Sequence, residues 1–149
     1  MVMQRNPPKR SISVSDVTGS RRVMIEAGED EDINPGIYGR QLATWLKSRL
    51  EESGYSVELI DEDWGRCLMC SWNPFRLWVG CANVWNPDLE PGQTPNKNDI
   101  VWHCFATAEV PFWKRLFGRV DTTSAVGELH ANLARILAAE PQIDLVEEP

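Results

Sequence analysis

Apolar and polar side chains alternate along several stretches of the chain, with the period of two that is typical of half-buried strands. The clearest stretch is Tyr55–Leu59, where Tyr, Val and Leu are separated by Ser and Glu. Asn73 and Pro74 separate two of the stretches, and this pair favours a turn that joins them as a hairpin. The predicted strands are Arg22–Ala27, Tyr55–Leu59, Trp64–Trp72, Phe75–Ala82, Ile100–Ala108 and a last strand around Ile143 and Leu145.

A period of about 3.6 residues marks helices in other parts of the chain. Asn34 supplies an N-cap side chain for the first long helix, which is expected to end at Gly54. The second long helix carries its apolar residues at positions 126–137 and is expected to end before Pro141. A short amphipathic helix is predicted at Phe112–Phe117.

The order of these elements is strand, helix, three strands, a loop, strand, short helix, long helix and strand. This order predicts an α+β domain of the split βαβ type with an added hairpin. We expect a two-layer sandwich in which a mainly antiparallel sheet of five or six strands carries two long helices on one face. Residues 21–149 are expected to form this single domain, with a long surface loop at 86–99.

Residues 1–20 are predicted to be a flexible N-terminal arm. They include Pro7 and Pro8, four serines and scattered basic residues, a composition that favours a mobile terminus. The alternative is a short edge strand formed by Ile12, Val14 and Val17.

The composition is that of an ordinary globular protein except for its tryptophans. The 149 residues are 42% hydrophobic and 25% charged, and seven of them are tryptophan. A formal net charge of -7 opposes nucleic-acid phosphates, so nucleic acid is not an expected partner. No apolar stretch approaches the roughly 20 residues that cross a bilayer, and a membrane is not an expected partner either. Four cysteines without a secretory signal favour reduced thiols and a cytoplasmic location.

Cys67 and Cys70 form a CxxC pair that, with Cys81, His103 and Cys104, offers soft ligands for zinc. The pair lies inside a predicted strand, where residues three positions apart point to opposite faces. We therefore expect buried thiols at these positions, with no metal and no cofactor. A redox role is disfavoured as well, because the pair precedes a hairpin and not the helix N-terminus that stabilises a thiolate.

The two histidines, His103 and His130, are the side chains best suited to proton transfer near neutral pH. Neither lies in a recognisable catalytic motif, and Asp121 and Ser124 near His130 are better explained as helix caps. No catalytic residue is therefore predicted.

Two acidic runs, at residues 29–32 and 61–63, follow successive predicted strands. Together they could offer oxygen ligands to a hard cation, but they show no EF-hand spacing. We favour their use as an electronegative patch that attracts a basic protein surface.

Tryptophans gather around the predicted hairpin and indicate a binding surface there. Along Phe75–Ala82, Arg76 and Trp78 point away from the face that carries the aliphatic side chains. Either Trp102 or His103 points the same way, because successive strand residues alternate. An aromatic sheet face with an arginine is typical of a recognition surface. The candidate binding residues are Trp64, Trp72, Trp78, Arg76, Asp63, Trp85 and His103.

Structural alternatives stand beside this interpretation with equal weight. The tryptophans could close an edge of the core, or the helix at Phe112–Phe117 or a second subunit could cover the face. The sequence FWKRLF of that helix also suggests contact with a membrane surface, but it is too short to favour such contact over packing.

The stretch INPGIYGRQLATWLKSRLEESGYSVELIDEDWGRCLMC, residues 33–70, resembles small uncharacterised bacterial domains. In these domains a helix, a Gly-Tyr strand start and an acidic Asp-Trp-Gly corner follow one another. The resemblance covers about a quarter of the chain, implies a bacterial origin and transfers no activity.

The residues together favour a non-enzymatic protein-binding or regulatory module that presents the aromatic face and the acidic corner to a protein partner, preferably a basic one. The alternative is a small-molecule ligand-binding protein or enzyme with a pocket under the 86–99 loop, to which His103, Asp63 and Glu109 would contribute. A third interpretation makes the aromatic face the contact of a homodimer.

Overall fold

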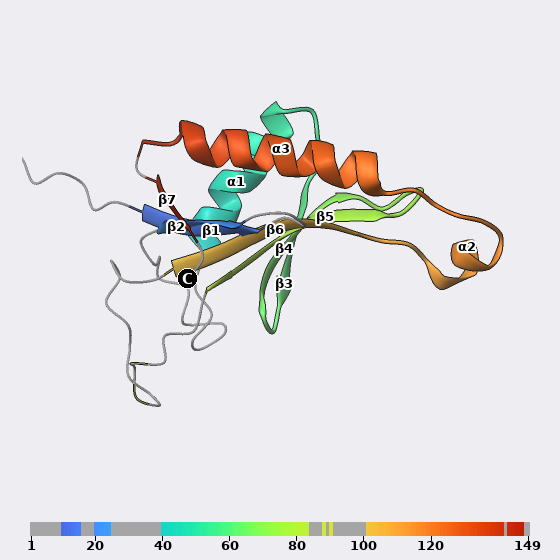
Figure 1. Cartoon of the computed structure of the whole chain (residues 1–149), viewed down its shortest axis with the longest axis horizontal. Helices are drawn as coiled ribbons and strands as arrows, with labels where there is room; N and C mark the ends of the chain where they lie inside the picture. Colours follow the sequence, from blue (N-terminus) through green and yellow to red (C-terminus); the bar gives the residue numbers. More distant parts are fainter. Residues whose placement is uncertain are drawn as a thin grey trace, which may run out of the picture.

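The computed structural model of the chain describes residues 10–15, 20–24, 40–83, 88, 90, 101–141 and 143–147. Strands and helices alternate along these residues much as the sequence predicts, with one strand added at the start (Figure 1). The elements are β1 (Arg10–Ser15), β2 (Ser20–Met24), α1 (Arg40–Glu52), β3 (Glu58–Glu62), β4 (Gly65–Ser71), β5 (Arg76–Asn83), β6 (Val101–Glu109), α2 (Phe112–Leu116), α3 (Thr123–Ala139) and β7 (Ile143–Glu147).

The centre of the fold is a regular antiparallel sheet of four strands, β3, β4, β5 and β6, each paired with the next along the chain. At the free edge of β6 the remaining strands join, and the seven strands take the order β1-β7-β2-β6-β5-β4-β3. There β1 pairs in parallel with β6 and β7, whereas β2 pairs with both in the antiparallel sense. The predicted α+β class is confirmed. The count of five or six strands is wrong, because the regular antiparallel sheet has four and β1 enters in the parallel sense.

Element boundaries differ from the predictions mainly around the first helix and the strand after it. Helix α1 ends where Gly54 adopts a positive φ of 99°, as predicted. Strand β3 starts three residues later than predicted, and the Tyr55 hydroxyl accepts a hydrogen bond from Asn132 Nδ2 of α3 at 3.2 Å. Tyr55 therefore belongs to the contact between the helices and not to the sheet.

Several predicted features lie outside the described residues. These are Ile25–Ala27, the acidic run at 29–32, the helix start at Asn34, Trp85, and the 86–99 loop apart from Asp88 and Glu90. Strand β1 falls within the predicted arm and coincides with the alternative strand at Ile12 and Val14. The division into an arm and a domain stays a prediction.

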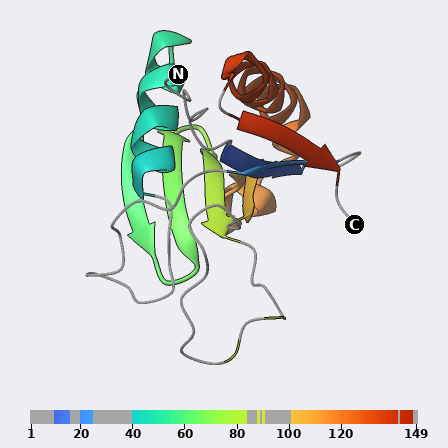
Figure 2. The same cartoon turned by 90° about the vertical axis from the view of Figure 1, so that its left-hand side faces the viewer.

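The buried core joins both long helices to the strands. Helix α1 contacts β3 and β4, α3 contacts β6 and β7, and the two helices contact each other (Figures 1 and 2). Each fully buried leucine stabilises the fold by roughly 1.5–3 kcal/mol relative to an exposed position. The buried helical residues follow the helical period and are Leu42, Ala43, Leu46 and Leu50 of α1 and Leu129, Leu133, Ile136 and Leu137 of α3.

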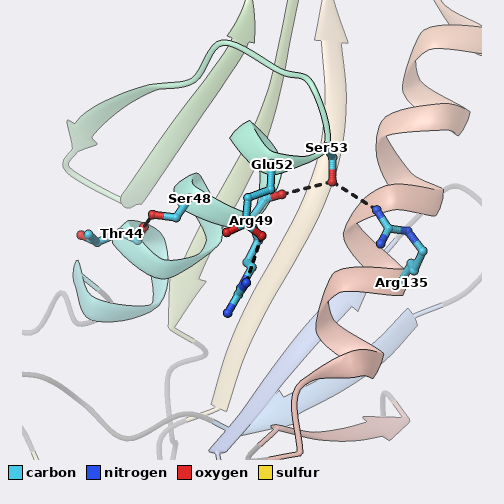
Figure 3. Close-up of polar contacts among 6 residues, drawn as sticks. All are labelled: Thr44, Ser48, Arg49, Glu52, Ser53 and Arg135. Atoms are coloured by element: carbon cyan, nitrogen blue, oxygen red, sulfur yellow. Dashed lines mark hydrogen bonds and ion pairs between the residues drawn. The ribbon is translucent and has the colours of Figure 1, made fainter.

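Polar contacts tie the end of α1 to α3 (Figure 3). Arg135 Nη2 donates a hydrogen bond to Ser53 Oγ at 3.1 Å, and Ser53 Oγ donates to the Arg49 carbonyl oxygen, also at 3.1 Å. Arg49 also forms an ion pair with Glu52 at 2.9 Å. The Arg49 carbonyl oxygen also accepts a hydrogen bond from the Ser53 backbone N–H at 3.2 Å, so the Ser53 hydroxyl links an already paired helix end to α3. No helix in the described part of the chain has both the length and the apolar character that crossing a bilayer requires.

Candidate functional site

Strand alternation divides β4, β5 and β6 into two faces. On β5, Leu77 and Val79 join the buried core, so Trp78 between them points the other way. On β6, Trp102 joins the core and is fully buried, so His103 points to the opposite face. The sequence left Trp102 and His103 as alternatives for that second face, and the structure assigns it to His103.

Four rings contact one another on the second face, and we call them the aromatic cluster: Trp64, Trp78, His103 and Phe105. The Trp78 ring centroid lies 5.8 Å from that of Trp64 and 5.6 Å from that of Phe105. Phe105 also lies 6.1 Å from Trp64 and 5.5 Å from His103. Such pairs are worth roughly 0.5–1.5 kcal/mol each beyond the area they bury. Trp64 is 40% exposed, and the other three rings are half-buried.

Phe105 holds the centre of the aromatic cluster, and the sequence prediction missed it. Its ring lies over Gly80, the residue directly opposite it on β5. A Cβ added at Gly80 would come within 3.0 Å of three ring carbons of Phe105. A glycine inside a strand often marks such a close approach, so Gly80 was the signal that could have located this ring.

Trp72 and Arg76 form a separate polar group at the hairpin end of the same strands. Trp72 Nε1 donates a hydrogen bond to Glu58 Oε2 at 3.2 Å, and the Arg76 guanidinium lies 5.6 Å from the Trp72 ring centre. Arg76 also lies 3.7 Å from Glu109 in an ion pair whose members are both more than half exposed. An exposed pair of this kind contributes little to stability. Trp72 and Arg76 therefore border the aromatic cluster without belonging to it.

The acidic side chains of residues 61–63 do not share one environment, because successive residues of β3 point to opposite faces. Asp61 Oδ1 lies 3.1 Å from Nε of Arg66, a residue that is 0% exposed and points to the core face with Leu68. Arg66 Nη1 and Nη2 have no hydrogen-bond partner among the residues that the structure describes. Asp61 thus compensates a buried charge that sequence reasoning missed, since arginine is normally exposed. Asp63 stays exposed beside Trp64.

The two cysteines of the CxxC pair lie on opposite faces, as predicted. Cys70 belongs to the core, whereas Cys67 lies on the face of the aromatic cluster. Burial raises the pKa of each thiol to about 12, and the Glu62 carboxylate adds to the effect at Cys67. On the core face, Cys81 Sγ lies 3.2 Å from Cys104 Sγ, and burial raises the pKa of Cys104 as well. Protonated thiols are poor nucleophiles and poor metal ligands.

Within the described residues, no three His, Cys, Asp or Glu side chains are arranged to hold a metal ion. Asp121 Oδ1 accepts a hydrogen bond from the Thr123 backbone N–H at 2.9 Å, which lowers the pKa of that carboxyl group. This contact at the start of α3 agrees with a structural use of Asp121. His103 and Glu109, two of the residues assigned to the alternative pocket, lie at opposite ends of β6, roughly 20 Å apart at the rise of a strand.

Helix α2 does not cover the aromatic cluster. Its apolar side chains are exposed: Phe112 by 75%, Trp113 by 60%, Leu116 by 66% and Phe117, at the helix end, by 89%. The alternative in which this segment packs against the sheet face is therefore wrong. The four side chains form a second uncovered apolar surface.

No protein-family model, curated protein or solved structure matches the chain. Its function is therefore inferred from its own residues and their geometry.

Proposed function

We propose that the chain is a non-enzymatic protein-binding or regulatory module whose aromatic cluster and adjoining carboxylates contact a basic protein partner. The observation that carries the proposal is the set of ring contacts among Trp64, Trp78 and Phe105 on the strand face opposite the core. Tryptophan and other large aromatic side chains dominate binding energy at protein interfaces. The rings here are already ordered by one another, so little conformational entropy is lost when they bind.

Charge around the aromatic cluster favours a basic partner. Glu58, Glu62 and Asp63 lie on β3 and in the turn that carries Trp64, and the whole chain has a net charge of -7. Opposite charge at an interface raises the association rate and disfavours acidic competitors. Asp61 is excluded from this role because it pairs with Arg66.

The proposal includes a two-layer arrangement in which α1 and α3 both cover the core face and leave the aromatic face open to a partner. The contacts of α1 with β3 and β4, of α3 with β6, and of the helices with each other support it. We also propose a bacterial cytoplasm as the location. The sequence resemblance favours the bacterial origin, and four free cysteines fit a reducing compartment.

Affinity capture from a native lysate at low and high salt tests the function, with Trp64→Ala and Ala131→Asp compared with the wild-type chain. Trp64→Ala is expected to weaken capture of the partner at least roughly thirtyfold, because truncating an interface tryptophan typically costs 2 kcal/mol or more. Ala131→Asp changes an exposed position of α3, outside both the aromatic cluster and α2, and it should leave capture unchanged. High salt should weaken the wild-type interaction.

Thermal unfolding of the same variants separates binding from folding. Trp64→Ala is expected to lower the free energy of unfolding by about 1–3 kcal/mol, since the ring makes two aromatic contacts but is 40% exposed. Equal capture by all three chains, or capture lost only in a variant that has also unfolded, would contradict the proposal.

A further inference from the structure

Helix α2 presents its apolar side to solvent and a basic side chain to the body of the protein. Phe112, Trp113, Leu116 and Phe117 occupy positions i, i+1, i+4 and i+5, which lie on one side of a helix. On the other side, Lys114 Nζ donates a hydrogen bond to the Pro74 carbonyl oxygen in the β4–β5 turn. An amphipathic helix on a folded domain normally buries its apolar side instead.

The exposure is costly enough to indicate a partner. Fully burying a large apolar side chain stabilises by roughly 1.5–3 kcal/mol, and α2 leaves four of them 60–89% exposed. Contiguous exposed apolar surface of this kind usually marks an interaction site. The helix stands at one end of the long axis, beyond the strands (Figure 1), where its own sheet does not cover it.

The chemistry of this surface matches that of the aromatic cluster. We define the α2 knob as the four exposed apolar side chains together with the exposed basic residues beside them, Arg115 and Arg119. The aromatic cluster is bordered by the carboxylates Glu58, Glu62 and Asp63. One surface is aromatic and basic, and the other is aromatic and acidic. Both belong to the same chain, so every copy carries both halves of a complementary contact.

We propose that the α2 knob of one copy docks on the aromatic cluster of a second copy. The inference rests on the proposed function, because it names the occupant of the same face. A reciprocal exchange of knobs closes into a dimer with two-fold symmetry, the commonest closed assembly. It places six aromatic side chains of the two knobs in the interface, which can bury about 900 Å² or more, and the two aromatic clusters that they cover add to this area. The interface can therefore exceed the roughly 1,000 Å² that a specific association needs.

Sedimentation velocity of the full chain over a wide concentration range tests the proposal. The wild-type chain is expected to dimerise. Phe117→Asp in the knob and Trp64→Ala in the aromatic cluster should each weaken the dimer at least roughly thirtyfold, since each removes an aromatic anchor. Ala131→Asp places the same charge at an exposed position of α3, away from both surfaces, and should leave the dimer unchanged.

Mixing the two weakened variants separates the proposed contact from other dimers. The Phe117→Asp chain keeps an intact aromatic cluster, and the Trp64→Ala chain keeps an intact knob, so the mixture should regain one of the two contacts. A mixture that associates no better than either variant alone would overturn the proposal. So would a dimer that Trp64→Ala dissolves and Phe117→Asp leaves intact, because its contact would join two aromatic clusters.

A chain that stays monomeric at every concentration also overturns the inference. Co-sedimentation with phosphatidylcholine vesicles, with and without phosphatidylglycerol, then shows whether the knob instead binds an anionic lipid surface. Loss of vesicle binding in Phe117→Asp would assign the knob to the membrane. Capture of another protein that persists in Phe117→Asp and fails in Trp64→Ala would leave the proposed function standing while this inference falls.

Discussion

The two faces of β4 bury their side chains to a similar extent but in different surroundings. On the core face, Leu68 and Cys70 belong to the buried core that also holds leucines of α1 and α3. On the other face, Cys67 and Met69 are 5% and 6% exposed, although neither belongs to that core. In the part of the chain that the structure describes, the second face carries the rings of the aromatic cluster. Burial therefore does not distinguish a core from a recognition surface, whereas the nature of the covering groups does.

The side chains of the two faces also differ in whether they can contact a partner. The aliphatic side chains of the core are buried and have no surface left to offer. On the face of the aromatic cluster, Cys67 and Met69 are buried while Trp64 stays partly exposed. A single layer of rings can thus serve stability and recognition together, and the following predictions test how far the two faces differ.

The largest effect is expected from shortening a side chain on the core face. Leu68→Ala should lower the free energy of unfolding by about 2–5 kcal/mol, because it leaves a cavity in a closely packed region. Met69→Ala, one residue along on the other face, should cost clearly less, because exposed rings can shift into the vacated space. Urea unfolding followed by circular dichroism measures both. Equal losses would show that the aromatic face is a second core and would weaken its assignment as a binding surface.

Whether the sequence predicts a contact on these faces depends on how far apart its residues are along the chain. Alternation along a strand is local. It correctly placed Trp78 on the face opposite to that of Leu77, and Cys67 on the face opposite to that of Cys70. The place of Phe105 over Gly80 depends on the register between β5 and β6, which are joined by a long connection. No local pattern contains that register, so the centre of the aromatic cluster was missed.

Two other features were beyond sequence reasoning for related reasons. Arginine is normally exposed, and only the pairing of β3 with β4 places Asp61 beside the buried Arg66. The amphipathic pattern of α2 predicts a helix, but it does not tell which side faces the protein. That orientation follows from the contact between Lys114 and Pro74, 40 residues apart in the chain.

The second prediction concerns the close approach that orders the aromatic cluster. Gly80→Ala places a methyl group within 3.0 Å of Phe105 ring carbons, so the ring must move. We expect a loss of about 1–3 kcal/mol in the free energy of unfolding, as for other overpacked positions, together with a changed tryptophan fluorescence spectrum. Gly127→Ala is the matched control. Gly127 is an exposed position of α3, where an added Cβ meets nothing within 4 Å. It should stabilise the helix by about 1 kcal/mol or less.

The double variant Gly80→Ala with Phe105→Ala tests whether the clash with the Phe105 ring causes this loss of stability. Removing the ring removes the obstacle, so the methyl group should cost less in that background than in the wild-type chain. If the cost is the same in both backgrounds, the contact between β5 and the Phe105 ring is not what orders the face.

The smallest expected effect is the fall in the free energy of unfolding as the pH rises. Cys67 on the aromatic face and Cys70 on the core face allow the two faces to be compared. The folded chain holds the protons of Cys67 and Cys70 up to a pKa of about 12, whereas an ordinary thiol loses its proton near pH 9.0. The unfolded chain therefore binds fewer protons than the folded chain above that pH, and stability falls as the pH rises between the two values.

From about pH 8 to about pH 10, each thiol should lower the free energy of unfolding by about 1.4 kcal/mol. Cys67→Ala and Cys70→Ala should each reduce this loss by the same amount, as measured by urea unfolding at both pH values. A reduction in Cys70→Ala alone would mean that water reaches Cys67 and that the face of the aromatic cluster is less well sealed than the core.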